Sequence, residues 1–188
     1  MNQQPHFFFA VSIPEETKLM MKKHFEQLKD KMPFSRWVHH EDLHITLAFL
    51  GNAPTEKLHH AEKNVITEVS GFEPFKLQIH QLGFFGKTDS PRIFWADTIG
   101  STELNDLRNK VFMACEEAGF QLEKRPFRPH MTLARKWQGE QPFQTESLEI
   151  WKELQPEPIV FDVTEVVLYQ THLQQTPKYE AISRIPLR

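Results

Sequence analysis

Two histidine–threonine pairs are the residues of this chain whose type and spacing best suit chemistry. His44 begins the stretch HITLA, with Thr46 two residues later, and His130 begins HMTLA, with Thr132 two residues later. Successive side chains of an extended strand point to opposite faces, so the histidine and the threonine of each stretch share one face. The pattern predicts two strands that each carry one imidazole and one hydroxyl on the same side.

Two imidazoles and two hydroxyls are suited to the hydrolysis of a phosphodiester. Histidine titrates near neutrality, so one imidazole can take a proton from water while the other, as imidazolium, gives a proton to the departing alkoxide. The two must lie on opposite sides of phosphorus, because the attacking and leaving oxygens are roughly in line. The hydroxyls of Thr46 and Thr132 can donate to the non-bridging oxygens, and these roles require no metal.

The short pattern His-x-Thr is weak by itself, since a chain with 10 histidines can contain it by chance. The alternative interpretation is a pair of amphipathic strands whose polar faces happen to carry histidine and threonine. The agreement over five residues favours a shared phosphate site.

The second stretch lies in a basic segment. Residues 123–136 carry one acid, Glu123, against the bases Lys124, Arg125, Arg128, Arg135 and Lys136, in a chain of net charge −3. Such a segment suits a phosphate-bearing ligand, and the alternative is that these are solvated surface charges. Arg135 is the candidate phosphate ligand. Its odd spacing from His130 would place it on the opposite face of a regular strand, so this role needs a bend, a bulge or a long reach.

Aromatic residues near the two stretches are candidates for stacking on a nucleobase. These are Trp37, Phe84, Phe85 and Phe127. Most phenylalanines of a chain with 16 of them must instead lie in the core.

Composition limits the class of protein. With 188 residues and 39% hydrophobic content, we expect one domain, or two small lobes that share a core. The one cysteine, Cys115, excludes an internal disulfide and a multi-cysteine metal site. No stretch is long and apolar enough to cross a membrane, and the apolar run 7–11 is too short for a signal peptide. We therefore expect a soluble, cytoplasmic protein.

Strands and helices alternate along the predicted chain. Strands are predicted at 7–13, 36–38, 43–50, 75–82, 92–98, 130–136, 160–173 and 178–187. Helices are predicted after Pro14 and Pro54, at 102–118 and around 146–154. Ser12 and Glu15 have the spacing of a capping box, and 83–91 is predicted as a loop. A motif strand recurs in each half, and a pseudo-twofold axis between the halves would bring the four polar side chains together.

The two stretches and their surroundings resemble the two-histidine phosphoesterase superfamily, and within it the RNA 2′,3′-cyclic phosphodiesterases of bacteria and archaea, once described as 2′-5′ RNA ligases. The resemblance covers nearly the whole chain. It rests on the Phe-rich strand ending at Pro14, Trp37-Val38, HITLAFLG (44–51), PRIFW (91–95) and FRPHMTLAR (127–135). One departure is that family members often carry a serine and a glycine before a late tyrosine, where this chain has residues 171–177 and then Tyr179.

The resemblance implies an α+β fold in which two pseudo-symmetric lobes with antiparallel sheets line a central cleft and helices lie outside, as one domain over residues 1–188. It implies metal-independent hydrolysis of RNA 2′,3′-cyclic phosphodiester ends to 2′-phosphomonoesters, with no cofactor. It implies His44 as proton donor and His130 as proton acceptor. It also implies Thr46, Thr132 and Arg135 as substrate-binding residues. The expected partner is RNA or a nucleotide with a 2′,3′-cyclic phosphate, with no metal or membrane, and we expect a monomer.

Other functions stay open from the sequence. The chain could act on small nucleotides or on 2′-5′ linkages, which a comparison of cyclic mononucleotides, cyclic-ended RNA and 2′-5′ oligoadenylate would decide. It could instead bind RNA ends without catalysis, in a ligase-like role, and tight binding without turnover would favour this. A histidine-based metal protein is disfavoured, because neither motif has a carboxylate cluster beside it.

Overall fold

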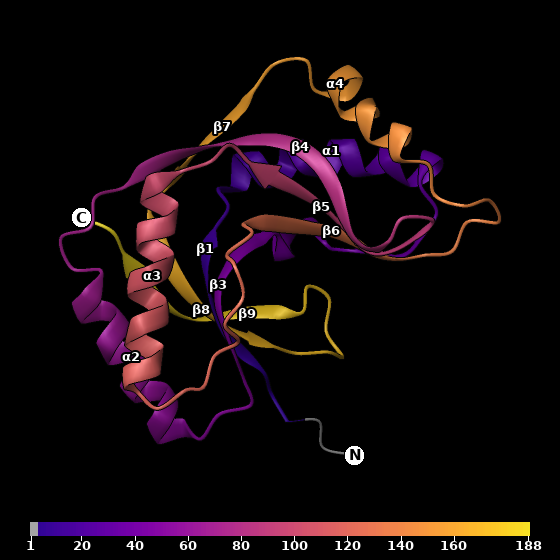
Figure 1. The fold of residues 1–188 in the computed structure, drawn as a ribbon. Helices are drawn as coiled ribbons and strands as arrows, with labels where there is room; N and C mark the ends of the chain where they lie inside the picture. The colour runs from indigo at the N-terminus through magenta and orange to yellow at the C-terminus, as the bar shows by residue number, and fades with distance from the viewer. Residues whose placement is uncertain (1–3) are drawn as a thin grey trace.

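The strands of the computed structural model, which describes residues 4–188, form two antiparallel sheets (Figure 1). The first sheet has the order β3 (His44–Gly51), β1 (Phe7–Ser12), β8 (Glu165–Thr171), β9 (Tyr179–Pro186). The second has the order β2 (Phe34–Trp37), β6 (His130–Trp137), β5 (Ser90–Thr98), β4 (Phe75–Lys87), β7 (Ile159–Val163). The predicted α+β class with two antiparallel sheets is confirmed, and the two motif strands lie in different sheets.

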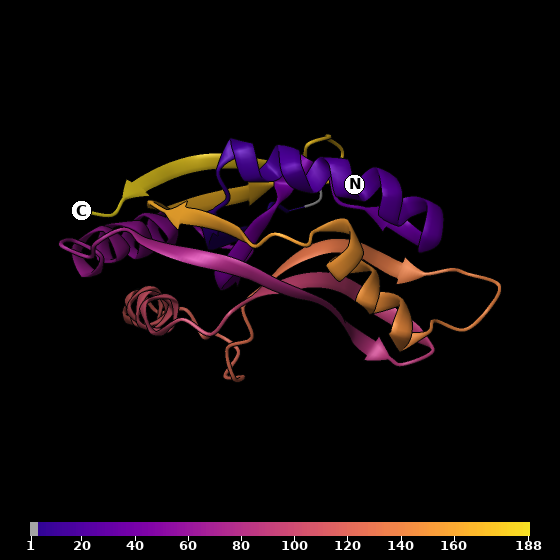
Figure 2. The same cartoon turned by 90° about the horizontal axis from the view of Figure 1, so that it is seen from above.

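The helices lie outside the sheets. They are α1 (Glu15–Lys31), α2 (Thr55–Glu68), α3 (Thr102–Glu117) and α4 (Ile150–Leu154), with short 3-10 turns at His40–Asp42 and Thr145–Glu149. α2 and α3 lie side by side at one end of the sheets, and α1 and α4 lie at the other end (Figures 1 and 2). Among the described residues, no helix has the length and apolar character needed to cross a membrane.

α3 illustrates why these helices form. Ser101 caps it, since its hydroxyl accepts a hydrogen bond from the Leu104 amide at 3.1 Å. Its buried side is an apolar stripe at helical spacing: Leu104, Leu107, Val111, Ala114 and Cys115. Cys115 is therefore a buried core residue, as its place on the stripe predicts.

Most buried side chains of both sheets form one continuous core, which includes Phe9, Ile45, Phe94, Met131 and Leu133. A second, smaller cluster lies on the other face of the first sheet and contains Phe8, Ala10, Val167 and Tyr169. β1 is thus buried on both faces, which explains its unbroken apolar run. The smaller cluster matters for function because one motif histidine lies on it.

Three sequence predictions about local structure are wrong, and the first two concern the start of α1 and the segment 160–173. The capping box is not formed: no side chain caps α1, and the Ser12 hydroxyl instead donates to the Glu165 carboxylate at 2.9 Å, because Ser12 still belongs to β1 beside β8. The segment 160–173 is not one strand. It divides at Thr164 into β7 of the second sheet and β8 of the first, so the chain crosses between the sheets there.

The predicted loop 83–91 is mostly strand, because β4 continues to Lys87 and β5 begins at Ser90. Gly83, the first residue of the predicted loop, lies within β4 and allows a close approach there. A Cβ at this position would lie 2.2 Å from the ring of Trp95, its partner across the sheet. The glycine therefore makes room for the indole, which lies next to the candidate site.

Candidate active site

β3 and β6 lie in contact and begin with the two motif histidines, His44 and His130. In both strands the histidine and the threonine are partly exposed and the apolar residue between them is buried. The one-face geometry predicted for each pair is confirmed. The two histidines are also close enough for the charge of His130 to lower the pKa of His44.

Both imidazoles are held in the same way by a carbonyl oxygen two residues earlier in the chain. The Nδ1 atom of His44 lies 2.7 Å from the Asp42 oxygen, and Nδ1 of His130 lies 2.7 Å from the Arg128 oxygen. A carbonyl oxygen only accepts, so Nδ1 carries the hydrogen in both rings and Nε2 is left for proton exchange. Nε2 of His44 lies 3.0 Å from the Thr46 hydroxyl oxygen.

A β-bulge follows the threonine in each motif strand. In β6 the pairing with β5 passes from Thr132 to Ala134, and both Leu133 and Ala134 are buried. The extra residue shifts the alternation, so Arg135 returns to the face that carries His130 and Thr132. The bulge that the phosphate-binding role of Arg135 required is therefore present.

The same bulge occurs in β3, where the pairing with β1 passes from Thr46 to Ala48. Phe49 consequently occupies the position that corresponds to Arg135. Its side chain is 57% exposed, and its ring packs edge-on against His6 at 5.7 Å. Our sequence interpretation missed Phe49. Aligning the two motifs one residue past Leu-Ala places Phe49 opposite Arg135 and would have identified it.

His44 lies on the smaller apolar cluster. Its ring centroid is 4.8 Å from Phe8, 5.1 Å from Tyr179 and 5.9 Å from Tyr169. Burial among these rings lowers the pKa of His44 to about 4, against the raising effect of its hydrogen bond to the Asp42 carbonyl. Positive charges on His130, Arg135 and Lys178 lower this pKa further.

His130 has a different aromatic surrounding on the second sheet. Phe85 meets its ring edge-on at 5.0 Å, and Trp95 lies at 6.3 Å. Burial and the charge of Arg135 lower the pKa of His130, and the hydrogen bond to the Arg128 carbonyl raises it. Fewer positive neighbours lower the pKa of His130 than lower that of His44.

Asp42 fixes His44 through two kinds of contact. Its carbonyl orients the imidazole, and its buried carboxylate accepts the backbone N–H groups of Lys178 and Tyr179 at 3.0 and 3.1 Å. These bonds compensate the burial of the charge and attach His44 to the start of β9. The sequence shows only an acidic residue two positions before the histidine, so this role was missed.

Only one of the four proposed stacking residues lies beside a motif histidine, and this is Phe85. Trp37 packs against Phe34 at 6.1 Å, and Phe84 packs against Phe143 at 5.4 Å. Phe127 lies beneath the Arg108 guanidinium at 5.5 Å.

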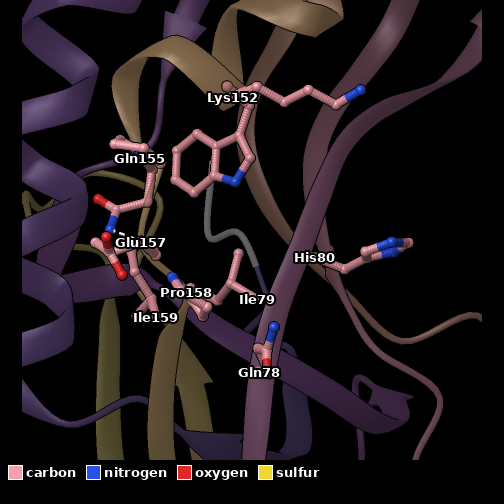
Figure 3. Close-up of a pocket in the computed structure, with 10 residues that line it drawn as sticks. Gln78, Ile79, His80, Lys152, Gln155, Glu157, Pro158 and Ile159 are labelled. Atoms are coloured by element: carbon pink, nitrogen blue, oxygen red, sulfur yellow. Dashed lines mark hydrogen bonds between the residues drawn. The ribbon is translucent and has the colours of Figure 1, made fainter.

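Two other features lie apart from the motif residues. Within residues 4–188, the one group of three potential metal ligands is Glu15, His40 and Glu41, whose ligand atoms lie within 4.8 Å of one another. A hollow of about 190 Å³ opens between β4 and residues 151–159 (Figure 3), where the Gln155 amide donates to the Glu157 carbonyl at 2.6 Å. No motif residue belongs to either feature.

Known proteins are similar to this chain in sequence and in fold. The model of the 2′-5′ RNA ligase superfamily matches residues 18–175, a span that holds both motifs. A protein from Geobacillus stearothermophilus named RNA 2′,3′-cyclic phosphodiesterase is 43% identical over 98% of this chain, which spans only 58% of that protein's length. A Bacillus subtilis protein of the same name is 35% identical over 98% of this chain and 97% of its own length.

The fold has a counterpart among solved structures. The crystal structure of E. coli LigT in apo form superposes with a TM-score of 0.73 at 24% identity, over 98% of this chain and 99% of that one. The family model and the two relatives confirm the resemblance stated from the motifs over nearly the whole chain. The chain belongs to the 2′-5′ RNA ligase superfamily, the two-histidine phosphoesterases.

Proposed function

We propose that this chain hydrolyses the 2′,3′-cyclic phosphodiester end of RNA to a 2′-phosphomonoester, without a metal and as a monomer. The observation that carries the proposal is the matched pair of imidazoles on contacting strands, each presenting Nε2 because a backbone carbonyl holds Nδ1. The names of the Geobacillus and Bacillus relatives, both RNA 2′,3′-cyclic phosphodiesterases, support this substrate.

The proton transfers follow from the two imidazoles. Nε2 of neutral His130 takes a proton from water, and the water oxygen bonds to phosphorus. The bond between phosphorus and the 3′ oxygen breaks, and Nε2–H of His44 protonates that oxygen. Burial lowers the pKa of His44 to about 4, so His44 serves as the acid only once the bound phosphate stabilises its imidazolium. The division of roles between the two histidines follows the resemblance to the two-histidine phosphoesterases.

Three side chains on the same faces bind the reacting phosphate in this proposal. The hydroxyls of Thr46 and Thr132 donate to its non-bridging oxygens, and their β-branched side chains keep them in place. Arg135 supplies a positive charge from beyond the bulge. An anion at this position favours the imidazolium of His44, whose pKa is otherwise held low by burial.

Two aromatic side chains, one exposed and one partly buried, are the candidates to stack on the terminal nucleobase. Phe49 follows the bulge of the first motif strand, and Phe85 lies beside His130 on the second sheet. A base stacks on such rings without regard to its identity. The proposal therefore includes little preference for one terminal base over another.

The test is product analysis with a short oligoribonucleotide that ends in a 2′,3′-cyclic phosphate, in buffer containing EDTA. We expect complete conversion to the 2′-phosphomonoester, identified by chromatography against 2′ and 3′ standards. A 3′-phosphomonoester would reverse the assignment of the leaving oxygen. Tight binding without conversion would favour an RNA-end-binding protein, and activity lost with EDTA and restored by a metal would contradict metal independence.

A further inference from the structure

A pocket of about 440 Å³ opens directly beside the motif residues, and four cations from four different elements line it. Lys29 comes from α1, Arg36 from β2, Arg135 from β6, and Lys178 from the segment between β8 and β9. The chain folds so that positive groups far apart in the sequence meet in one place. Such convergence is typical of a site for an anion.

The protein neutralises these four cations only in part. Asp42 is the one carboxylate in the pocket lining, and its two oxygens already accept the backbone N–H groups of Lys178 and Tyr179. Across residues 4–188, none of the four cationic side chains takes part in a salt bridge.

Two of the cations are placed directly opposite each other. Arg36 and Arg135 are register partners on the antiparallel strands β2 and β6. Like charges at such positions destabilise a sheet. Burial and the charges of Arg135 and Arg36 lower the pKa of Lys178, against the raising effect of Asp42. An anion bound between these groups would remove the repulsion.

Two residues of the pocket lining, Arg135 and Asp42, also act on the motif histidines His44 and His130. Arg135 lines the pocket, and its charge acts on the pKa of both motif histidines. Asp42 orients His44 with its carbonyl and holds the Lys178 segment with its carboxylate. An RNA chain whose terminal cyclic phosphate lies at the histidines carries its next negative charge on the 5′ side of the same nucleoside. The pocket, which Arg135 shares with the motif face, offers a basic surface for that charge.

We propose that Lys29, Arg36 and Lys178, with Arg135 shared, form a second phosphate subsite that binds the phosphodiester on the 5′ side of the terminal nucleotide. This inference rests on the proposed function and narrows it: the substrate class is an oligoribonucleotide, not a nucleoside cyclic phosphate. The subsite contributes binding energy away from the reacting centre, and the histidine–threonine pairs carry the chemistry.

The experiment isolates the charge of one phosphate. Two diadenosine substrates, each ending in a 2′,3′-cyclic phosphate, are compared: one with a natural internucleotide phosphodiester and one with a neutral methylphosphonate linkage. We expect wild type to favour the charged dinucleotide about tenfold in kcat/KM, as one charge-assisted contact allows. Arg36→Gln and Lys29→Gln should each reduce this ratio. Lys31→Gln, an exposed lysine of α1 outside the pocket, is the matched control and should keep the wild-type ratio.

Salt dependence gives a second readout. The slope of log kcat/KM against log salt for the charged dinucleotide should become shallower by about 0.7 for each cation removed, as for contacts to single strands. Arg36→Gln should also not lower the Tm, because it removes a like charge opposite Arg135. These readouts separate loss of a phosphate contact from loss of the fold.

The outcomes distinguish this inference from the proposed function. Equal wild-type rates on the two dinucleotides, or an unchanged ratio in both Arg36→Gln and Lys29→Gln, would overturn the subsite while leaving the cyclic phosphodiesterase intact. Failure of wild type to hydrolyse either dinucleotide would overturn the proposed function itself. A reduced ratio in Lys31→Gln as well would show a diffuse charge effect and would also overturn the subsite.

Discussion

His44 should make the folded protein sensitive to mild acid. The unfolded chain takes up a proton on this residue near pH 6.5, whereas the folded protein does so only near its lowered pKa of about 4. The folded state therefore binds fewer protons between these values. The contribution to stability is intact above pH 6.5 and is lost progressively as the pH falls toward 4.

The expected size of this effect follows from the two pKa values. A histidine whose pKa is 6.5 in the unfolded chain and about 4 in the folded protein lowers the free energy of unfolding by about 2 kcal/mol at pH 5 relative to pH 7. This is an upper value, because the ring is partly exposed and solvent screens its charge interactions. The perturbation is His44→Asn, since the asparagine amide can still donate to the Asp42 carbonyl in place of Nδ1.

The assay is urea unfolding of wild type and His44→Asn at pH 7, 6 and 5. Between pH 7 and pH 5 we expect the free energy of unfolding to fall by up to about 2 kcal/mol more in the wild type than in the variant. His60→Asn, which changes an exposed histidine of α2, serves as the control and should follow the wild-type curve. Inorganic phosphate should restore wild-type stability more at pH 5 than at pH 7. Parallel curves for wild type and His44→Asn would refute the burial argument.

Four further outcomes are expected. His130→Asn should lower kcat by about 10²- to 10⁴-fold while the circular dichroism spectrum stays unchanged, because it removes the general base; wild-type turnover would contradict this. Thr132→Val, similar in shape without the hydroxyl, should lower kcat/KM at least about tenfold; an unchanged value would remove Thr132 from the phosphate site. Gly83→Ala should lower the free energy of unfolding by about 1–3 kcal/mol, since the added methyl meets the Trp95 ring at 2.2 Å; urea unfolding that matches wild type would show that the ring moves freely. We propose that residues 1–188 form one domain and expect a single unfolding transition by fluorescence and circular dichroism, with two separate transitions as the contrary result.

The features of the site that depend on the local alternation of side chains along a strand were predicted from the sequence. Alternation along a strand correctly placed His44 with Thr46 and His130 with Thr132. It also showed that Arg135 needed an irregularity to join them, and the bulge at Leu133–Ala134 provides it. The Leu-Ala that both motifs contain lies at the bulge in each strand.

What the sequence did not reveal depends on contacts between distant segments. Asp42 is recognisable only when the Lys178 segment lies against it, and Arg36 only when β2 pairs with β6. No pattern within one window of sequence reports such pairings. The division of 160–173 at Thr164 was missed for the same reason, because the apolar residues on both sides fit a strand equally well and only the two sheets decide.

The assignment of His44 as acid and His130 as base is the central claim, and a sulfur-substituted substrate tests it most directly. A cyclic-ended oligonucleotide with sulfur in place of the bridging 3′ oxygen has a thiolate leaving group, which needs little protonation because thiols ionise near pH 8.5. Single-turnover rates are measured for wild type, His44→Asn and His130→Asn on the oxygen and sulfur substrates. We predict that sulfur restores turnover to His44→Asn and not to His130→Asn. Restoration in His130→Asn alone, or in neither variant, would contradict the account.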